Sequence, residues 1–319
     1  MLALDAMVDQ DLFICPRCGS PVRPADGEWH CAGASCAFAD EPFPVVAGVP
    51  ALVDFEHSVL DANRLRMVEG ASEVRRSRFA GPLRRLLHPA NTTAPRNVAR
   101  MEALLEADLQ GTPGRNPRIL VIGGGTVGDG LEGLYADPTV DLISFDVYAS
   151  PATQFVGDGH SIPLADGSVD GVIVQAVLEH VLEPTVVAAE IHRVLRVGGI
   201  VYADTPFLQQ VHEGAYDFTR FTDSGHRYLF RNFERIDSGS VAGAGTALRW
   251  SVDYFVRALT RSVPLGRVVS LCFFWLSWLD RFLDPKHSVD AASSVFFLGR
   301  KTDEPISGAD IIDYYQGGM

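Results

Sequence analysis

Four of the five cysteines lie close together near the start of the sequence. Cys15 and Cys18 form a C-x2-C pair, and Cys31 and Cys36 follow as a second pair after twelve residues. Four thiolates at this spacing suit tetrahedral Zn²⁺, because a tight turn within a pair points both sulfurs at one ion. His30 is an alternative ligand. Four cysteines already fill the shell, so the predicted zinc is structural and leaves no open position for catalysis.

The residues around these cysteines resemble a known small domain. The knuckle Cys15-Pro16-Arg17-Cys18-Gly19, the second pair and the ending P-V-x-x-G-V-P-x-L all occur within residues 12–54. Together they resemble the zinc-ribbon domain of the tRNA-methyltransferase activator family. That domain also occurs fused ahead of bacterial methyltransferases.

A glycine-rich turn follows a short apolar strand later in the chain. The strand covers Arg118–Ile122, and Gly123, Gly125 and Gly128 then fit G-x-G-x-x-G, a pattern that dinucleotide dehydrogenases share. A second strand, 140–145, ends at Asp146, 21 residues after Gly125. A carboxylate there can accept hydrogen bonds from both hydroxyls of a ribose.

The downstream residues favour one family. Residues 158–181 read D-x-x-x-x-P-x-x-D-x-S-x-D-x-V-x-x-x-x-x-L-E-H-V, and residues 190–199 read E-x-x-R-V-L-x-x-G-G. This series resembles class I S-adenosylmethionine-dependent methyltransferases. The resemblance implies a cofactor site in which Gly123 and Gly125 line the methionine end and Asp146 holds the ribose. It also places Asp158 at the adenine amino group and Gln175 near the sulfonium. The alternative is a degenerate fold that binds no cofactor.

A second group of reactive side chains follows the fifth expected strand, where open α/β folds bind substrates. The Pro-Phe turn at Phe207 is followed by His212, Asp217 and Arg220. A hydroxyl acceptor must lose its proton as it attacks, so His212 is the first candidate for a general base and His180 the second. Asp217 would orient the imidazole, and Arg220 would bind a carboxylate or phosphate. Alternatively, Asp217 and Arg220 pair with each other and His180 only caps or packs.

This stretch resembles P-F-x-x-x-x-H-x-x-P-x-D-F-x-R-[YF]-T of methyltransferases encoded with surface-polysaccharide and glycolipid genes. The resemblance implies O-methylation of a sugar hydroxyl, in a small-molecule or lipid-linked glycan, with Phe207 and Arg220 binding the acceptor. Two alternatives stay open. One is an rRNA guanine methyltransferase, whose family also carries a zinc module ahead of this fold. The other is a non-catalytic methyltransferase-like protein that activates a partner.

Composition limits the class of partner. The 319 residues are 47% hydrophobic and carry a formal net charge of −13, opposite in sign to most proteins that follow phosphate backbones. Nucleic acid is therefore disfavoured. Asp5, Asp9 and Asp11 stand where a secretory signal needs positive charge, and the longest uncharged apolar run, Val268–Leu279, is shorter than the roughly 20 residues of a spanning helix. We expect a cytoplasmic protein.

The elements that must position these groups suggest an α/β fold: a Rossmann-like seven-stranded methyltransferase sheet with helices on both faces. The expected divisions are a zinc ribbon (1–56), a helical linker (57–117), a methyltransferase domain (118–302) with a helical insertion at about 244–290, and a tail (303–319). The aromatic-rich segment 265–283 could be a lid, a homodimer surface, a peripheral membrane contact or core packing on the sheet. Cys272 within it is expected to be a buried apolar filler.

Overall fold

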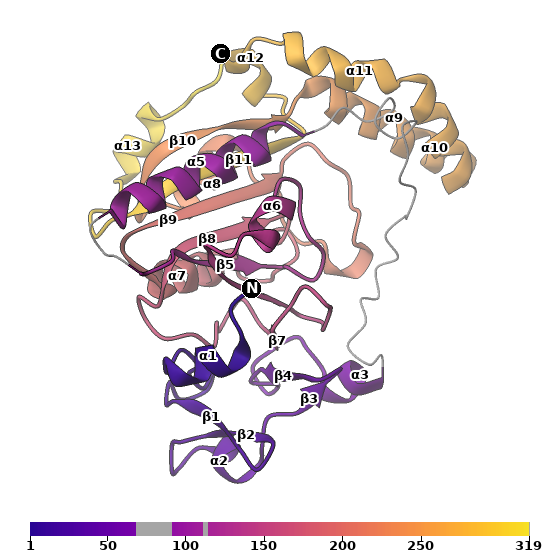
Figure 1. Ribbon diagram of the computed structural model, residues 1–319. Coiled ribbons are helices and arrows are strands. Elements are labelled where there is room, and N and C mark those ends of the chain that lie inside the picture. The colour runs from indigo at the N-terminus through magenta and orange to yellow at the C-terminus, as the bar shows by residue number, and fades with distance from the viewer. Residues whose placement is uncertain (68–90, 111–113, 319) are drawn as a thin grey trace.

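The computed structural model describes residues 1–67, 91–110 and 114–318. Its centre is a nine-stranded sheet (Figure 1). In spatial order the strands are β10 (Phe233–Ala242), β11 (Ser294–Lys301), β9 (Leu195–Pro206), β8 (Val169–Gln175), β5 (Arg118–Ile122), β6 (Asp141–Asp146), β7 (Phe155–Gly157), β4 (Val49–Leu52) and β3 (Val45–Val46). The seven strands from β10 to β7 confirm the expected Rossmann-like methyltransferase sheet. Of these, β5 to β9 pair in parallel, whereas β11 runs antiparallel to both of its neighbours.

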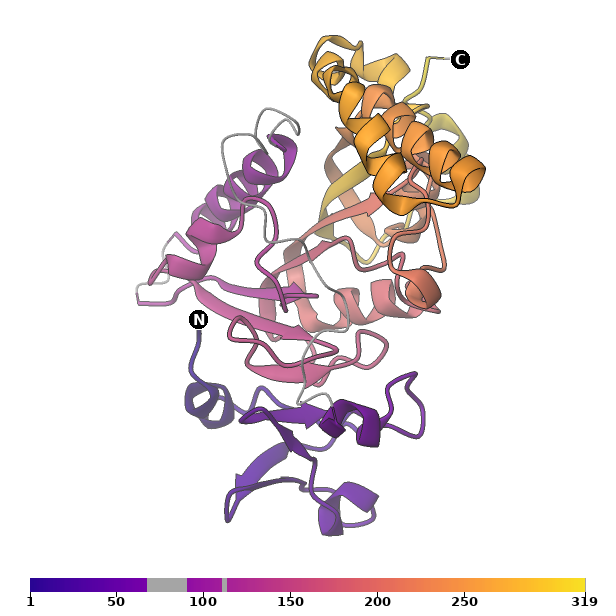
Figure 2. The same ribbon diagram turned by 90° about the vertical axis from the view of Figure 1, so that its right-hand side faces the viewer.

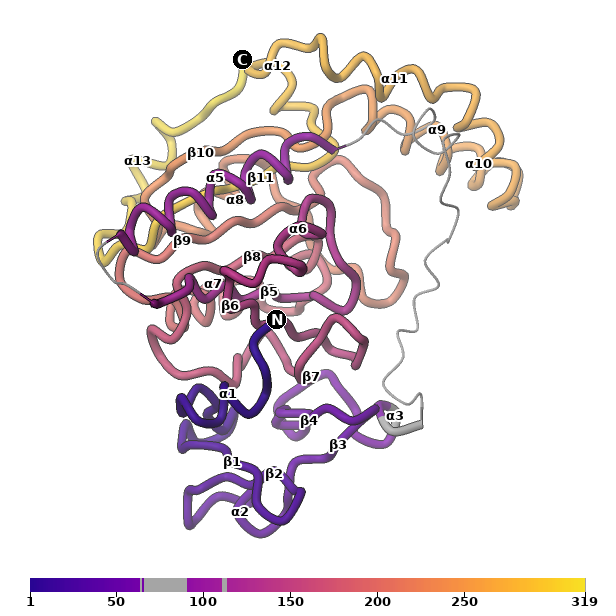
Figure 3. The backbone as a smooth tube through the Cα atoms, in the orientation of Figure 1, coloured from indigo at the N-terminus to yellow at the C-terminus, as the bar shows by residue number. Residues whose placement is uncertain are grey.

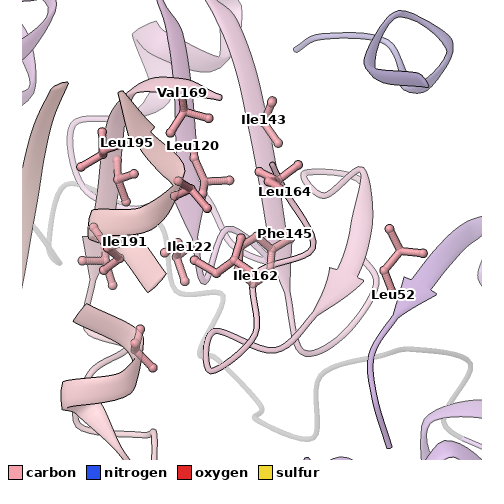
Figure 4. Packing of buried hydrophobic residues seen from close by; sticks show 14 of the residues in the cluster. Leu52, Leu120, Ile122, Ile143, Phe145, Ile162, Leu164, Val169, Ile191 and Leu195 are labelled. Carbon is pink, nitrogen blue, oxygen red and sulfur yellow. The ribbon is translucent and has the colours of Figure 1, made fainter. Parts of the chain in front are cut away.

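Helices cover both faces of the sheet. On one face, α5 (Thr93–Asp108) buries Val98, Met101 and Leu105 against the central strands, and α6 (Glu132–Ala136) adds Leu134. The other face is covered by α7 (Pro184–Val194) and α8 (Asp223–Leu229). Figure 4 shows Leu120, Ile122, Ile143 and Phe145 of β5 and β6 beside Ile191 of α7. The strands are apolar almost throughout because both faces are buried.

The expected ribbon contributes strands to the same sheet. Its own hairpin, β1 (Val22–Ala25) with β2 (Glu28–Cys31), lies next to α1 (Leu4–Asp9) and α2 (Ala37–Asp40). Beyond the hairpin, β4 pairs in parallel with β7, and β3 extends the edge. Phe13 packs edge-on against both Trp29 of the ribbon and Phe155 of β7, with ring centroids 5.4 Å apart in each case. The ribbon is therefore joined to the methyltransferase sheet by backbone pairing and by core contacts.

The expected insertion is helical and lies at the opposite end of the molecule from the ribbon (Figures 1 to 3). It comprises α9 (Ala244–Thr260), α10 (Val263–Cys272), α11 (Phe274–Leu279), the 3₁₀ turn η2 (Asp280–Phe282) and α12 (Pro285–Val289). Asp280 accepts hydrogen bonds from the backbone amides of Gly243, Gly245 and Thr246, and so caps the start of α9 from the far end of the insertion.

The insertion differs in two details from what the sequence suggests. The segment 265–283 is broken at Phe273 instead of forming one helix. Cys272 is exposed, because the apolar run around it lies on the surface of the insertion and not in the core.

No single helix within the described ranges is long and apolar enough to cross a membrane, although α10 together with Phe274–Phe282 meets the length and composition criteria as a pair bent by 51°. In the expected linker, α3 (Ala62–Met67) and α5 are helical, while residues 68–90 and 111–113 lie outside the described residues. The chain ends with α13 (Gly308–Asp313).

Candidate functional site

The four ribbon cysteines converge on one point. Their sulfur atoms all lie within 4.8 Å of one another, with Cys15 Sγ 3.7 Å from Cys36 Sγ and Cys18 Sγ 3.4 Å from Cys31 Sγ. A tetrahedral ion with metal–sulfur bonds of about 2.3 Å needs sulfur–sulfur separations of roughly 3.8 Å, so the four residues fit Zn²⁺. His30 is not in this group, since its Nδ1 lies 3.1 Å from the carbonyl oxygen of Ala39.

The glycine turn after β5 fits closely against its neighbours. Gly123 has a φ of +77°, and a Cβ atom there would lie 2.3 Å from Val177 Cγ2. The amide of Gly125 donates a 2.8 Å hydrogen bond to Oδ2 of Asp146 at the end of β6. The other oxygen, Oδ1, accepts from the amide of Val147. The turn and the expected ribose-binding carboxylate are thus held together before any ligand binds.

The end of β8 carries a buried hydrogen-bond acceptor. Gln175 Nε2 lies 3.3 Å from the Asp129 carbonyl oxygen and 3.4 Å from Asp204 Oδ2, while Gln175 Oε1 has no hydrogen-bond partner within residues 1–67, 91–110 and 114–318. Burial raises the pKa of Asp204 to about 6, despite a hydrogen bond from the Tyr202 hydroxyl. An orphaned acceptor next to the glycine turn fits a ligand that brings hydrogen-bond donors, as the amino group of S-adenosylmethionine would.

The expected adenine-binding residue, Asp158, follows β7 and faces the ribbon. Its carboxylate accepts from Ser58 Oγ at 2.5 Å and pairs with His160 Nδ1 at 2.6 Å. Burial alone would raise the pKa of Asp158, but the bonds from His160 and Ser58 outweigh it and hold that pKa below its ordinary value. A hollow at this junction is lined by Arg17, Asp54 and His57 of the ribbon side together with Asp158 and His160.

Glu179 and two histidines meet beyond the end of β8. Glu179 Oε1 lies 3.5 Å from His180 Nε2 and 3.7 Å from His212 Nε2. Glu179 is fully buried, and burial raises its pKa to about 8. The two candidate bases named from the sequence are therefore neighbours, with ring centroids 5.0 Å apart.

Asp217 contacts His212 and also pairs with a second residue of the same loop. Its Oδ2 accepts from the backbone amide of His212 at 2.8 Å and lies 3.4 Å from His212 Nδ1. The same carboxylate forms a two-point ion pair with Arg220, whose Nη2 is 2.7 Å away. Burial would raise the pKa of Asp217, but Arg220 holds it at about 2. Arg220 is therefore occupied within the loop, as the alternative interpretation of the sequence held.

The loop between β9 and α8 (residues 207–222), here named the acceptor loop, is covered by α9. Trp250 packs against His212 with ring centroids 6.1 Å apart, Tyr254 donates to the carbonyl oxygen of Val211, and Gln210 Nε2 donates to Ser251 Oγ. Between the loop and the helix lies an open cavity of about 360 Å³ with Phe207 in its lining. Gln210 Oε1 is a buried acceptor to which no residue in the described part of the chain donates. Phe207 therefore lines a cavity beside the loop that carries His212.

Two residues of this region were not selected from the sequence. Glu179 stands in the quoted L-E-H-V pattern, directly before His180, and that adjacency was the available signal. The sequence around Asp204 carries no comparable signal, because only the pairing of β9 with β8 brings its carboxylate to Gln175.

Known proteins match parts of the chain. Residues 136–203 match the family model described as a methyltransferase domain. An uncharacterised 37.1 kDa protein in transposon TN4556 of Streptomyces fradiae is 45% identical over 57 residues, a match that spans 18% of this chain and 16% of that protein.

Solved structures overlap with lower identity. Phosphoethanolamine N-methyltransferase 2 of Haemonchus contortus, in complex with phosphomonomethylethanolamine and S-adenosylhomocysteine, is 16% identical, with 67% of this chain and 54% of that chain covered and a TM-score of 0.42. The 1,6-didemethyltoxoflavin-N1-methyltransferase of Burkholderia thailandensis is 14% identical, with 66% and 80% covered and a TM-score of 0.37.

The family match runs from the last residue of α6 into β9 and includes Asp146, Asp158 and Gln175, which the sequence assigned to the cofactor. These strands lie in a sheet with the order β7-β6-β5-β8-β9-β11-β10, in which only the last two strands depart from parallel pairing. Residues 136–203 therefore match a methyltransferase domain and lie within a sheet of the Rossmann-like methyltransferase type.

Proposed function

We propose that this protein is an S-adenosylmethionine-dependent O-methyltransferase that acts on a sugar hydroxyl of a glycan or glycolipid. The observation that carries the proposal is the meeting of two loops at one sheet edge. The loop after β8 brings Gln175, Glu179 and His180, and the loop after β9 brings His212. Cofactor-binding and proton-handling groups then face the same space, as methyl transfer to a hydroxyl requires.

The cofactor would be held by residues already positioned. The ribose hydroxyls would replace the Gly125 amide as hydrogen-bond donors to Asp146. The amino group of the cofactor would donate to Gln175 Oε1. S-adenosylmethionine supplies an electrophilic methyl group on a sulfonium. The chain supplies orientation and a path for the acceptor proton, with His212 as the first candidate base and His180 as the second.

The acceptor would occupy the cavity beneath α9. Its lining combines Phe207, an aromatic surface on which a sugar ring can pack, with polar groups from Gln209, Gln210 and Ser251. A volume of about 360 Å³ is at the small end of ligand pockets, which suits one sugar unit of a longer acceptor better than a whole lipid-linked molecule.

The outer surface of the insertion suits an anionic membrane. Phe255 and Leu259 of α9, Val268 of α10, Trp275 of α11 and Phe282 of η2 are all exposed, Phe282 at 78%. The exposed charged side chains of residues 244–286 are Arg261, Arg267, Arg281 and Lys286 against Asp284, in a chain whose net charge is −13. Apolar side chains and local positive charge together favour peripheral binding to anionic lipid, which would bring a lipid-linked glycan to the cavity. A homodimer through the same helices is the competing prediction.

The alternatives are less well supported. An rRNA methyltransferase would need a continuous basic surface that binds the phosphate backbone. In this chain the exposed positive charges of the insertion lie among apolar side chains instead. An activator would need a ribbon surface that is available to another enzyme, and here β4 pairs with β7 of the same chain.

Transfer of a tritiated methyl group from S-adenosylmethionine tests the proposal. Glycolipid extracts, free oligosaccharides and ribosomal RNA would be offered in parallel. We expect label in the glycolipid or oligosaccharide fraction, and loss of label with His212→Ala while calorimetry shows cofactor affinity nearly unchanged. Asp146→Ala should instead weaken cofactor binding. Label only in RNA, or cofactor binding with no transfer to any fraction, would contradict the proposal.

Membrane binding has its own test. Sedimentation with vesicles of anionic phospholipid should retain the wild-type protein and release Phe282→Glu, with Ile312→Glu, at a similarly exposed site outside the insertion, as control. A wild type that does not sediment with the vesicles, or a dimer that the substitution at Phe282 dissociates, would favour the competing prediction.

A further inference from the structure

Three potential ligand atoms face one another at the acceptor edge of the sheet. One atom each from Glu179, His180 and His212 lies within 4.8 Å of the others, and Glu179 Oε1 is 3.5 Å and 3.7 Å from the two Nε2 atoms. Nitrogen and oxygen ligands bound at about 2.1 Å to a common ion stand roughly 3 to 4 Å apart. The spacing therefore matches a set of ligands for one metal ion.

The surroundings fix which nitrogen of each ring is free. His180 Nδ1 lies 2.7 Å from the carbonyl oxygen of Tyr216, which can only accept, so Nδ1 carries the proton. His212 Nδ1 faces the Gln210 carbonyl oxygen at 3.3 Å and Asp217 Oδ2 at 3.4 Å, and must likewise donate. In each neutral ring Nε2 is then a lone-pair acceptor aimed at Glu179. Metal-bound histidines typically show this arrangement, in which the second nitrogen donates to a carbonyl or carboxylate.

Three acceptors converge without a donor between them. Glu179 is fully buried, and neither of its carboxylate oxygens has a hydrogen-bond partner among the described residues. Arg220, the cation of the acceptor loop, is already paired with Asp217 and with backbone carbonyl oxygens. A buried carboxylate without compensation costs several kcal/mol of folding free energy, so the cluster must take up either a proton or a cation at its centre.

We propose that Glu179, His180 and His212 bind a divalent first-row transition-metal cation through the carboxylate and the two Nε2 atoms. Two imidazoles and one carboxylate suit Mn²⁺, Fe²⁺, Co²⁺ or Zn²⁺, and three protein ligands leave positions open for other ligands. This site is distinct from the four cysteines, which fill their own shell. Binding does not depend on the proposed function.

The role of the cation rests on the proposed function. An acceptor hydroxyl bound at an open position becomes more acidic, and its proton passes to solvent water. The hydroxyl oxygen then forms a bond to the methyl carbon, while the carbon–sulfur bond breaks and its electron pair stays on sulfur. In this arrangement His212 is a ligand and not the base expected from the sequence, although its replacement would impair turnover in either case.

Cobalt titration tests the site on full-length, zinc-loaded protein, prepared with one zinc per chain so that the metal fills only the four-cysteine shell. Because zinc already occupies the ribbon, we expect one further Co²⁺ per chain, with weak visible ligand-field bands and without the intense thiolate charge-transfer band that cysteine ligands would give. Manganese binding, counted from the loss of the free Mn²⁺ resonance signal, gives a second measurement on wild-type protein.

The cobalt affinity of substituted proteins distinguishes metal ligands from residues that only lie nearby. Glu179→Gln and His212→Gln should weaken cobalt binding by more than tenfold, and Asp217→Asn, which removes the partner of His212, by about 10- to 100-fold. Glu183→Gln, an exposed carboxylate four residues from Glu179, should bind cobalt as the wild type does. Circular dichroism would confirm that each variant is folded.

The outcomes distinguish this site from the proposed function. Zinc-loaded wild-type protein that binds neither Co²⁺ nor Mn²⁺, or Glu179→Gln that binds cobalt with unchanged affinity, would overturn the site even if methyl transfer occurs. It would mean that a proton occupies the cluster instead. Cation binding that depends on Glu179, without methyl transfer to any acceptor, would leave the site standing and reject the function.

Discussion

The contact between Phe13 and Phe155 predicts that the ribbon and the methyltransferase sheet unfold together. Phe13 is only 1% exposed and packs edge-on against Trp29 on one side and Phe155 on the other. Replacing a fully buried phenylalanine by alanine removes its burial and leaves a cavity, which costs about 3–5 kcal/mol of unfolding free energy. Because the ring bridges both parts, Phe13→Ala should lower the stability of both by this amount.

Urea unfolding with two probes measures this. A chromophoric chelator reports zinc release from the ribbon, and far-ultraviolet circular dichroism reports mainly the helices of the methyltransferase part. We expect coincident transitions in the wild type, and in Phe13→Ala a shift of both to lower urea. Phe38→Ala serves as control, since Phe38 is only partly buried and stacks on Phe43 within the ribbon, so its shift should be smaller. A zinc-release transition that moves in Phe13→Ala while the dichroism transition stays would refute the coupling.

Three further predictions concern single sites. Burial lowers the pKa of His226 to about 3, so the unfolded chain binds the extra proton as the pH falls below about 6.5. Wild-type stability relative to His226→Gln should therefore fall by about 1.6 kcal/mol in total between pH 6.5 and 5, and an unchanged difference between the two proteins at both pH values would contradict this. Gly123→Ala should weaken S-adenosylmethionine binding measured by calorimetry, because its φ is +77° and the new Cβ would meet Val177, whereas Gly133→Ala, with open space around it, should bind normally. Metal analysis should find about one zinc per ribbon in the wild type and a large loss in Cys18→Ser, and a folded, zinc-free wild type would exclude the ribbon assignment.

The parallel strands could be predicted because their signal is local. The Arg118–Ile122 strand was predicted with its observed bounds, since a short apolar run followed by glycines is typical of a strand that is buried on both faces. The cysteine cluster was equally local, because its ligand spacing lies within 22 residues.

Other features depend on contacts between distant segments. Nothing in residues 45–52 indicates that they pair with β7, since the partner is chosen by tertiary packing and not by the strand's own pattern. The apolar run around Cys272 has the composition of a core helix, and only the position of the insertion at the molecular edge exposes it. Glu179 became a candidate only when the fold brought His212 beside it.

The pairing of β4 with β7 has a consequence for how the chain folds during synthesis. Ala51 pairs with Val156, so about a hundred residues must follow the ribbon out of the ribosome before its last strand finds its neighbour. The cysteines can take up zinc long before that, because they need only the first 36 residues. During this interval the apolar side of β4 would lack its neighbour, and the protein would depend on the metal-bound hairpin to keep that waiting strand from pairing elsewhere.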